Sequence, residues 1–494
     1  MFGLPGGEIV AFIDACRRAG IRFLLTGHEA SAAWMAQVVG QITGVPGVCA
    51  STLGPGATNL VTGVANAWLD RAPMLAVTAQ IPGAAMETMT HQRVPLDRLF
   101  APVTKGSFAV GSGDTVTLME RSMHLAAEPR PGPVHISLAS DLAVQEYHEQ
   151  PRQRAIELEA GAAPDLRPIM RRLESAARPL VLIGLGATPA SAPAIRAFID
   201  KLQAPFLVTP KAKGIAAEDH PLFAGVASGM AIDRDIVEII KRADLILAIG
   251  FDPVECDKTW FADVDVASID SASMAEGRYR PLEAIGDLGA LVASLNPAPK
   301  PWRASLPKHE ARSGLSPLRL IEELRSIFPR DGIATCDVGS HKLVMGQFWR
   351  SYQPGTFFMS NGLSGMGFGI PAAIAAQLCH PQKPVIAVVG DGGMLMMLHD
   401  LVLIRELGLP ILIVVLSDRS LSLIRVSEER RGFPAYGVDF TPPDFAAVAQ
   451  AFGIAGRRVG SIGEAKTCAE KALTERAPFV LEVPIDFGEY YDLV

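Results

Sequence analysis

Several features that would assign this chain to a special class are missing from its sequence. Its six cysteines are scattered without a C-x-x-C pair, which indicates neither a disulfide framework nor a zinc site. No Lys/Arg-rich run accompanies the net charge of −7, so nucleic-acid binding is not indicated. No apolar run reaches the roughly 18 residues of a membrane span, and no signal-peptide pattern opens the chain. We therefore expect a soluble cytoplasmic protein that binds neither nucleic acid nor membrane.

What the sequence does contain indicates several domains. A chain of 494 residues is too long for one core and, at roughly 150 residues per domain, suggests about three. Two charged stretches rich in Pro or Ala, 146–166 and 296–316, lack a sustained apolar period and are typical of linkers. The predicted domains are 1–150, 165–298 and 315–494.

Short β-rich apolar runs alternate with helical periodicity in each predicted domain. Apolar and polar residues do not alternate within these runs, which indicates strands covered on both faces and hence an α/β fold of three doubly wound parallel sheets. In such sheets ligands bind at the carboxyl ends of the strands. The predicted strands are 23–27, 47–52 and 74–80, then 179–186, 205–209, 244–250 and 266–270, then 332–339, 384–392, 411–418 and 479–486.

The stretch VIAVVGDGGML (385–395) ends a predicted strand with glycines and a carboxylate, before a helix predicted over 394–408. The start of a helix favours a phosphate, but Asp391 would repel a phosphate unless a divalent cation lay between them. Asp418 ends the next predicted strand, so both acids would share one edge of the sheet and suit Mg²⁺, which binds carboxylates and substrate phosphates. A glycine turn with a helix-capping Asp is the alternative.

GDGG followed by SDRSLSLI (417–424) resembles the signature of thiamine diphosphate (ThDP) enzymes. The resemblance implies that Asp391, Asp418 and the backbone carbonyl of Ser420 bind Mg²⁺. This chain has Asp418 where the family usually has Asn, but Asp is as good an oxygen ligand. The residues that the resemblance places at the cofactor in this segment are Gly390, Asp391, Gly392, Gly393, Asp418, Ser420 and Leu421.

GHEASAAW (27–34), followed by GPGATN (54–59), resembles the pyrimidine-binding domain of the same family. The resemblance implies that Glu29 contacts N1′ of the aminopyrimidine and that Pro55 and Asn59 lie near that ring. A proton shared between Glu29 and N1′ would let the 4′ nitrogen accept the proton of thiazolium C2, and burial should raise the pKa of Glu29 enough for this. A surface loop is the alternative for a His-Glu pair by itself.

Two further segments resemble cofactor-contacting parts of the family. CDVGSHKLV (336–344) resembles the diphosphate segment, which implies contacts by Gly339, Ser340 and His341. SNGLSGMGFG (360–369) resembles the cofactor loop, in which Gly365 contacts the cofactor and Met366 is the apolar wedge that bends it; core filling is the other use of such a methionine. The whole chain follows the family order of pyrimidine-binding, central and diphosphate-binding domains. The family's active sites lie between subunits, so a homodimer at minimum, and a homotetramer by analogy, is implied.

The segment THQRVPLDRLFAPVTKGS (90–107) resembles acetolactate synthases in particular. By that match Gln92 and Lys105 orient the substrate, and Lys105 suits the carboxylate of a 2-oxo acid. An ordinary exposed lysine is the alternative. Ile424 stands where decarboxylases of the family have an acid, which favours joining two substrates over releasing an aldehyde.

The expected activity is the ThDP- and Mg²⁺-dependent condensation of two pyruvates to 2-acetolactate and CO₂. IGFDPVECDKTW (249–260) resembles the FAD-independent catabolic enzymes, so FAD is not expected, and GLGA (184–187) fits a simple strand–helix turn. His341, Arg93 and Ser427 depart from the catabolic pattern and could accommodate another acceptor. The alternatives are a 2-hydroxyacyl-CoA lyase or benzaldehyde-lyase-like enzyme acting on another 2-oxo acid, and a ThDP-binding protein without catalysis.

Overall fold

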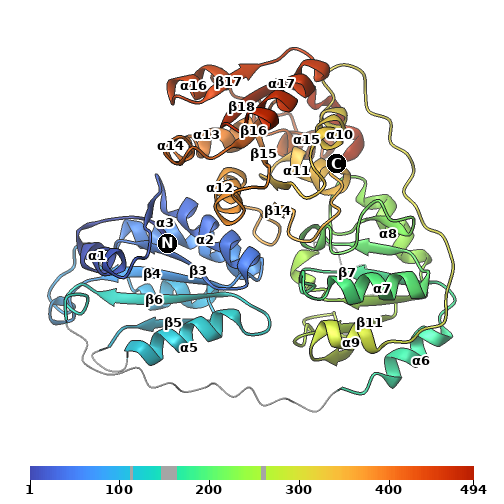
Figure 1. The fold of residues 1–494 in the computed structure, drawn as a ribbon, viewed down its shortest axis with the longest axis horizontal. Helices are drawn as coiled ribbons and strands as arrows, with labels where there is room; N and C mark the ends of the chain where they lie inside the picture. The colour runs from blue at the N-terminus through green and yellow to red at the C-terminus, as the bar shows by residue number, and fades with distance from the viewer. Residues whose placement is uncertain (112–114, 146–163, 257–262) are drawn as a thin grey trace.

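The structure is a computed structural model that describes residues 1–111, 115–145, 164–256 and 263–494 (Figure 1). Three six-stranded sheets follow one another along these residues, and every strand pair in them is parallel. Helices pack on the sheets through clusters of buried apolar side chains. The predicted α/β architecture of three doubly wound sheets is confirmed. Within the described ranges, no helix combines the length and apolarity needed to cross a membrane.

The N-terminal sheet has the strand order β2-β1-β3-β4-β6-β5. Its strands are β1 (Phe2–Leu4), β2 (Leu24–Leu25), β3 (Gly47–Ser51), β4 (Met74–Gln80), β5 (Gly106–Ala109) and β6 (Pro133–Ala139). The helices of this domain are α1 (Val10–Arg18), α2 (Glu29–Thr43), α3 (Pro55–Leu69), α4 (Leu96–Phe100) and α5 (Thr115–Ala127).

The central sheet has the order β12-β11-β10-β7-β8-β9, which reverses between β7 and β10. Gly184 and Gly186 follow β7 at this reversal, where a Cβ on Gly184 would lie 2.4 Å from Cα of Phe251. Close backbone packing accounts for the glycines of GLGA, in line with a strand–helix turn. The strands are β7 (Pro179–Ile183), β8 (Phe206–Val208), β9 (Phe223–Val226), β10 (Leu245–Ile249), β11 (Val266–Asp270) and β12 (Leu282–Ile285). The helices are α6 (Arg167–Ser175), α7 (Ala192–Leu202), α8 (Asp233–Arg242) and α9 (Leu288–Ser294).

The C-terminal sheet has the order β14-β13-β15-β16-β18-β17, which reverses between β13 and β15. Its strands are β13 (Ile333–Cys336), β14 (Phe357–Met359), β15 (Val385–Gly390), β16 (Ile411–Ser417), β17 (Ala455–Arg458) and β18 (Phe479–Pro484). The helices are α10 (Pro317–Ile327), α11 (Ser340–Phe348), α12 (Gly369–Cys379), α13 (Asp391–Met396), α14 (Asp400–Leu407), α15 (Ser422–Arg430), α16 (Phe445–Ala451), α17 (Ile462–Glu475) and α18 (Tyr490–Leu493).

The single helix predicted over 394–408 is wrong, because two helices, α13 and α14, share this stretch. Helix α13 begins earlier, at Asp391, and ends at Met396; the next residue, Met397, has left helical geometry (φ −118°, ψ 20°). The break allows Met397 to join the core cluster that contains Trp34 and allows Asp400 to accept a hydrogen bond from Ser31 (2.9 Å). Contacts with the N-terminal domain therefore accompany the break in the helix, which the helical periodicity of the sequence did not predict.

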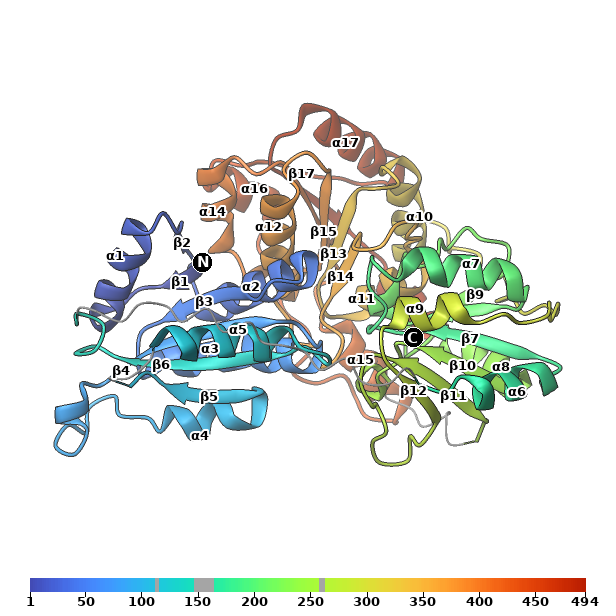
Figure 2. The same ribbon diagram turned by 60° about the horizontal axis from the view of Figure 1, so that its bottom comes forward.

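The C-terminal domain packs on both other domains. Helix α12 lies against α2, and the alanines of both helices share one buried cluster. Figure 2 shows the N-terminal and central domains on either side beneath the C-terminal one. The predicted linker 296–316 contains neither helix nor strand, whereas 146–163 of the other predicted linker lies outside the described residues. The exact domain boundaries stay a prediction.

Candidate functional site

Two carboxylates meet at the carboxyl edge of the C-terminal sheet. Strands β15 and β16 pair in parallel, and each is followed at once by an acid, Asp391 and Asp418. Oδ1 of Asp391 accepts from the backbone N–H of Gly392 (2.8 Å) and Oδ2 accepts from that of Arg419 (2.7 Å). Oδ1 of Asp418 accepts from the backbone N–H of Ser420 (3.1 Å). Backbone donors therefore hold the two acids at one edge.

Burial makes both of these acids harder to ionise. Burial raises the pKa of Asp391, which is 2% exposed. Burial, and then the charge of Asp391, raise the pKa of Asp418 to about 6. A divalent cation would relieve both effects, since it is the usual partner of carboxylates gathered in this way. The described residues contain no group of three or more His, Cys, Asp or Glu side chains that could hold a metal, so further ligands would come from backbone or substrate oxygens.

A third acid, Asp337, lies at the point where the order of this sheet reverses. It follows β13 directly, is 1% exposed, and accepts from the backbone N–H groups of Val338 (2.7 Å) and Gly367 (2.8 Å). A Cβ on Gly393 would lie only 2.1 Å from its Oδ2, so the glycine lets α13 approach this carboxylate. Burial raises the pKa of Asp337 to about 6. Asp337 lies in the segment CDVGSHKLV, but the resemblance predicts no role for it. An acid at a strand end beside glycines is the sequence signal that could have identified it.

The start of α11 lies next to these acids. Ser340 begins the helix after Gly339, and its Oγ lies 2.9 Å from Oγ of Ser422. His341 is 5% exposed, and burial lowers its pKa to about 4. A Cβ on Gly390 would lie 3.0 Å from Cε1 of His341, so this glycine makes space for the imidazole. The structure thus brings the predicted diphosphate segment to the predicted metal edge.

Met366 approaches the same edge from the loop 360–367. A Cβ on Gly392 would lie 3.3 Å from Cε of Met366 and 3.2 Å from Cδ2 of Leu421. Gly365 precedes Met366 and lies near Trp34, whose ring would be 3.7 Å from an added Cβ. Two apolar side chains therefore stand over the glycines that follow Asp391.

Glu29 lies in the N-terminal domain, at the first position of α2. The ring of His28 accepts from the backbone N–H of Ala30 (3.0 Å) and so caps this helix. Glu29 is 4% exposed, and its Oε2 accepts from Nδ2 of Asn59 (3.0 Å). Asn59 stands on α3, which begins at Pro55. The three residues predicted to surround the pyrimidine therefore form one cluster.

The two predicted substrate residues lie apart. Gln92 is exposed and has a positive φ of 56°; its Cβ would lie 3.0 Å from a Cβ on Gly54, beside the turn that starts α3. Lys105 precedes β5, next to Pro133 at the start of β6, and its Nζ pairs with Glu128 (3.2 Å). It thus lies at the amino edge of a parallel sheet whose carboxyl edge holds Glu29. A residue before a strand and a residue after one lie at opposite edges of the sheet, so the fold separates Gln92 from Lys105. Their shared role at one substrate channel stays a prediction.

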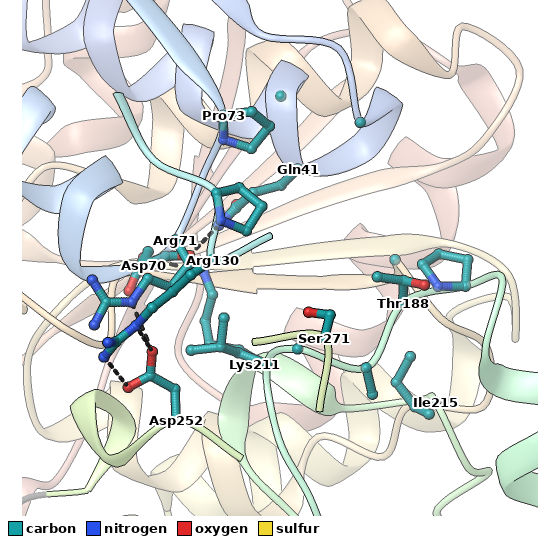
Figure 3. A pocket seen from close by; sticks show the side chains of 18 of the residues that line it. Gln41, Asp70, Arg71, Pro73, Arg130, Thr188, Lys211, Ile215, Asp252 and Ser271 are labelled. Atoms are coloured by element: carbon teal, nitrogen blue, oxygen red, sulfur yellow. Dashed lines mark hydrogen bonds and ion pairs between the residues drawn. The ribbon is translucent and has the colours of Figure 1, made fainter. Parts of the chain in front are cut away.

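No hydrogen bond or ion pair among the described residues joins Glu29 to Asp391, Asp418 or Ser420 within the chain. A separate cavity of about 430 Å³ lies where the three domains meet (Figure 3). None of the predicted site residues lines it. Apart from Gln92 and Lys105, the predicted residues accordingly form one cluster around Glu29 in the N-terminal domain and one cluster of acids and glycines in the C-terminal domain.

Family models match all three domains. The thiamine pyrophosphate enzyme N-terminal TPP binding domain matches residues 1–98, the central domain of these enzymes matches 166–295, and their C-terminal TPP binding domain matches 337–483. The chain belongs to the thiamine diphosphate enzyme family. In this ThDP enzyme the acids that the sequence predicts at the cofactor lie on the carboxyl edges of the sheets, where α/β folds bind ligands.

Curated relatives of this ThDP enzyme are similar along nearly their whole length. The acetolactate synthase of Bacillus subtilis (strain 168) is 30% identical, with 100% of this chain and 91% of the relative covered. Acetolactate synthase isozyme 2 large subunit of Escherichia coli (strain K12) is 31% identical, with 98% and 92% covered. The acetolactate synthase large subunit of Lactococcus lactis is 30% identical, with 99% and 90% covered. The chain is thus a ThDP-dependent, acetolactate synthase-like carboligase.

Proposed function

We propose that this enzyme condenses two pyruvate molecules to 2-acetolactate and CO₂, using ThDP and Mg²⁺. The observation that carries the proposal is the pair of acids at neighbouring strand ends, the buried Asp391 and the half-buried Asp418, near Met366, in a chain similar to acetolactate synthases over its full length. Bound ThDP would supply a carbon nucleophile that adds to a 2-oxo acid and accepts the electrons left by CO₂.

Mg²⁺ would be held by Asp391, Asp418 and the backbone carbonyl of Ser420, with diphosphate oxygens completing its shell. The raised pKa values of both acids support this assignment, because burial disfavours their charged forms and a bound cation would stabilise those forms. Leu421 and Met366 would give the cofactor an apolar wall. The glycines 390, 392 and 393, with Gly339, Ser340 and His341, would let the diphosphate approach the backbone.

Glu29 would share a proton with N1′ of the pyrimidine, and Asn59 would orient the carboxyl group through the hydrogen bond described above. Since Glu29 and Asp391 do not meet within one chain, we place the active site between two subunits. Exposed apolar side chains beside the acids support an interface there: Leu395 (37%), Met396 (50%) and Val402 (44%). A homodimer is the minimum, and a homotetramer is the assembly expected by analogy.

Substrate would be bound close to Gln92 and Ile424. Ile424 on α15 is half-exposed in the single chain, and no acid side chain occupies its position to protonate the product of decarboxylation. In the reaction one C–C bond breaks to release CO₂, and one C–C bond forms to the carbonyl carbon of the second pyruvate. The resulting alkoxide takes up one proton. A substrate role for Lys105 stays a prediction that its pairing with Glu128 does not favour.

The test is to incubate the purified enzyme with pyruvate, ThDP and Mg²⁺ and to measure CO₂ and acetolactate together. We expect one acetolactate for each CO₂, two pyruvates consumed, no product without ThDP, and strongly reduced product with Glu29→Gln. CO₂ with free acetaldehyde would indicate a decarboxylase. No turnover of pyruvate by ThDP-loaded enzyme would exclude the acetolactate proposal and direct the substrate panel to other 2-oxo acids and 2-hydroxyacyl-CoA compounds.

The cytoplasmic location of the enzyme stays a prediction.

A further inference from the structure

Asp70 is the polar centre of the junction between the three domains (Figure 3). It follows α3 directly, and its side chain is 1% exposed. Its Oδ1 accepts from the backbone N–H groups of Asn361 (3.3 Å) and Gly362 (2.8 Å), at the start of the loop 360–367. Its Oδ2 accepts from Nζ of Lys211 (3.1 Å), which comes from the central domain and also donates to the carbonyl of Met359 (3.1 Å). One carboxylate thus links all three domains at the base of this loop.

Further polar groups connect Asp70 to the loop. Oδ2 also accepts from Gln37 (3.0 Å) and from Nδ2 of Asn66 (3.4 Å). Oδ1 of Asn66 in turn accepts from Oγ of Ser360 (2.5 Å), and that hydroxyl accepts from the backbone N–H of Gly365 (3.0 Å). Gly365 is the residue before Met366. A continuous chain of hydrogen bonds therefore runs from Asp70 to the proposed wedge.

The loop has little freedom at either end. A Cβ on Gly362 would lie 2.6 Å from Cβ of Leu69 and 2.9 Å from its carbonyl oxygen, so the loop rests directly on the end of α3. At the far end Asp337 accepts from the backbone N–H of Gly367. Met366 stands just before that second attachment, so its place over Gly392 depends on both carboxylates.

We propose that Asp70, neutralised by Lys211, is a positioning residue that sets the cofactor loop 360–367 and thereby the affinity of this enzyme for ThDP. The inference rests on the proposed function, in which Met366 contacts the cofactor. Asp70 itself touches neither cofactor nor substrate. It acts through backbone N–H groups, which a carboxylate orders more strongly than a neutral acceptor does.

Asp70→Asn tests the carboxylate with almost no change of shape. Two donors converge on Oδ1 and three on Oδ2, so the new amide NH₂ must face donors whichever way it turns. Lys211 also loses its counter-ion. We expect the loop to detach from α3 and the Kd for ThDP to rise about tenfold or more.

The chain offers a matched control in the next residue. Arg71 pairs through Nε with Oδ2 of Asp252 (2.7 Å), and this ion pair also joins the N-terminal and central domains (Figure 3). The side chains of Arg71 and Asp252 are 9% and 1% exposed. This ion pair is therefore as buried as the pair of Lys211 and Asp70, whose side chains are 8% and 1% exposed. Neither Arg71 nor Asp252 hydrogen-bonds to the loop 360–367. Asp252→Asn should destabilise the same junction and leave the Kd for ThDP within about threefold of wild type.

The experiment titrates ThDP at fixed Mg²⁺ into wild type, Asp70→Asn and Asp252→Asn, following Trp fluorescence and repeating each Kd by calorimetry. Trp34 lies against Gly367, with a ring carbon 3.1 Å from an added Cβ, and reports on the loop directly. Thermal unfolding of the cofactor-free proteins gives their relative stabilities. We expect both variants to lose stability and only Asp70→Asn to lose affinity.

The inference is overturned if Asp70→Asn binds ThDP as wild type does, or if both variants weaken binding equally. If Asp70→Asn does not fold, Gly362→Ala carries the test, because its methyl group would push the same loop off Leu69 with Asp70 intact. It too should raise the Kd, and an unchanged Kd would count against the inference. Wild type that fails to bind ThDP would instead overturn the proposed function.

Discussion

The N-terminal and C-terminal domains have the same strand order and carry acids at different strands. Counted within each domain, both sheets run 2-1-3-4-6-5. In the C-terminal domain an acid follows the first, third and fourth strands: Asp337, Asp391 and Asp418. In the N-terminal domain the acid of the site is Glu29, which opens the helix after the second strand.

The difference shows that the shared strand order supplies a ligand-binding edge in each sheet, and that the side chains at this edge determine which ligand binds. Three acids at strand ends, of which Asp337 and Asp391 are buried and Asp418 is half-buried, accept hydrogen bonds from backbone N–H groups and suit a metal and its diphosphate. One buried acid held by the neutral amide of Asn59 suits the handling of a proton. The same fold can therefore supply the two halves of one cofactor site.

The largest effects on activity should come from replacing an acid of either cluster by the corresponding amide. Glu29→Gln should lower kcat by roughly 10²–10⁴-fold while leaving Mg²⁺ and ThDP binding intact, because only proton sharing is lost. Asp391→Asn should abolish activity together with Mg²⁺-dependent ThDP binding, because a ligand of the cation is lost. Turnover assays and calorimetric titrations separate the two variants. Glu29→Gln with unimpaired turnover would contradict the proton role.

Mixing these two variants tests whether the domains of different chains form one site. After unfolding and refolding together, half of the dimers are mixed, and each mixed dimer holds one site with the partner subunit's Glu29 and its own Asp391 intact. We expect about one quarter of wild-type activity from an equal mixture. Each variant refolded by itself is the control. A mixture as inactive as its components would mean that each chain builds its site alone.

A smaller effect is expected from adding one methyl group to the C-terminal edge. Gly393→Ala would bring Cβ to 2.1 Å from Oδ2 of Asp337 and should cost roughly 1–3 kcal/mol of stability along with cofactor affinity. Gly463→Ala on α17 is the control, since an added Cβ there meets nothing within 4 Å. Chemical denaturation measures both. Equal stability of the two variants would show that α13 yields without strain.

The smallest effect concerns the contact between the two domains. Burial raises the pKa of Asp400 to about 7, opposed by the hydrogen bond from Ser31. The folded protein therefore binds a proton that the unfolded chain releases near pH 4, and stability should fall as pH rises from about 4 to 7. Asp400→Asn should remove this dependence, so its stability relative to wild type should improve by on the order of 1 kcal/mol between pH 5 and pH 8.

Other groups facing Asp400 set the control for that measurement. His399 lies 3.5 Å away through Nε2, and its own pKa is lowered by burial and then by His28. Its titration remains in Asp400→Asn, so His399→Gln is compared in the same pH series. A pH profile of Asp400→Asn parallel to that of wild type would show that Asp400 ionises freely in the fold.

Much of the fold and of the site could be read from the sequence. The apolar runs that became β4, β15 and β16 are buried on both faces, and such runs carry a strong signal. Strands such as β14 and β17 were missed because they are three or four residues long. The break at Met397 depends on Ser31 and Trp34, more than 360 positions away, and no local pattern contains that contact.

The site shows the same limit. Local motifs at predicted strand ends identify three site residues, namely Asp391, Asp418 and Glu29. Gln92 and Lys105 lie in one sequence segment, but Gln92 follows β4 and Lys105 precedes β5, so the two residues lie at opposite edges of the parallel sheet. Asp70 carries no motif, and its importance follows only from the donors of three domains that meet at it.

Helix α3 has two ends that serve different purposes. Its first turns carry Asn59, which orients Glu29, and the residue after its last turn is Asp70, which holds the loop of Met366. If Glu29 serves the partner's cofactor, one helix of 15 residues, roughly 22 Å long, influences two different cofactor molecules, one through Glu29 and the other through the loop 360–367. Each dimer then contains two such helices, and cofactor binding at one site would be coupled through them to the other site.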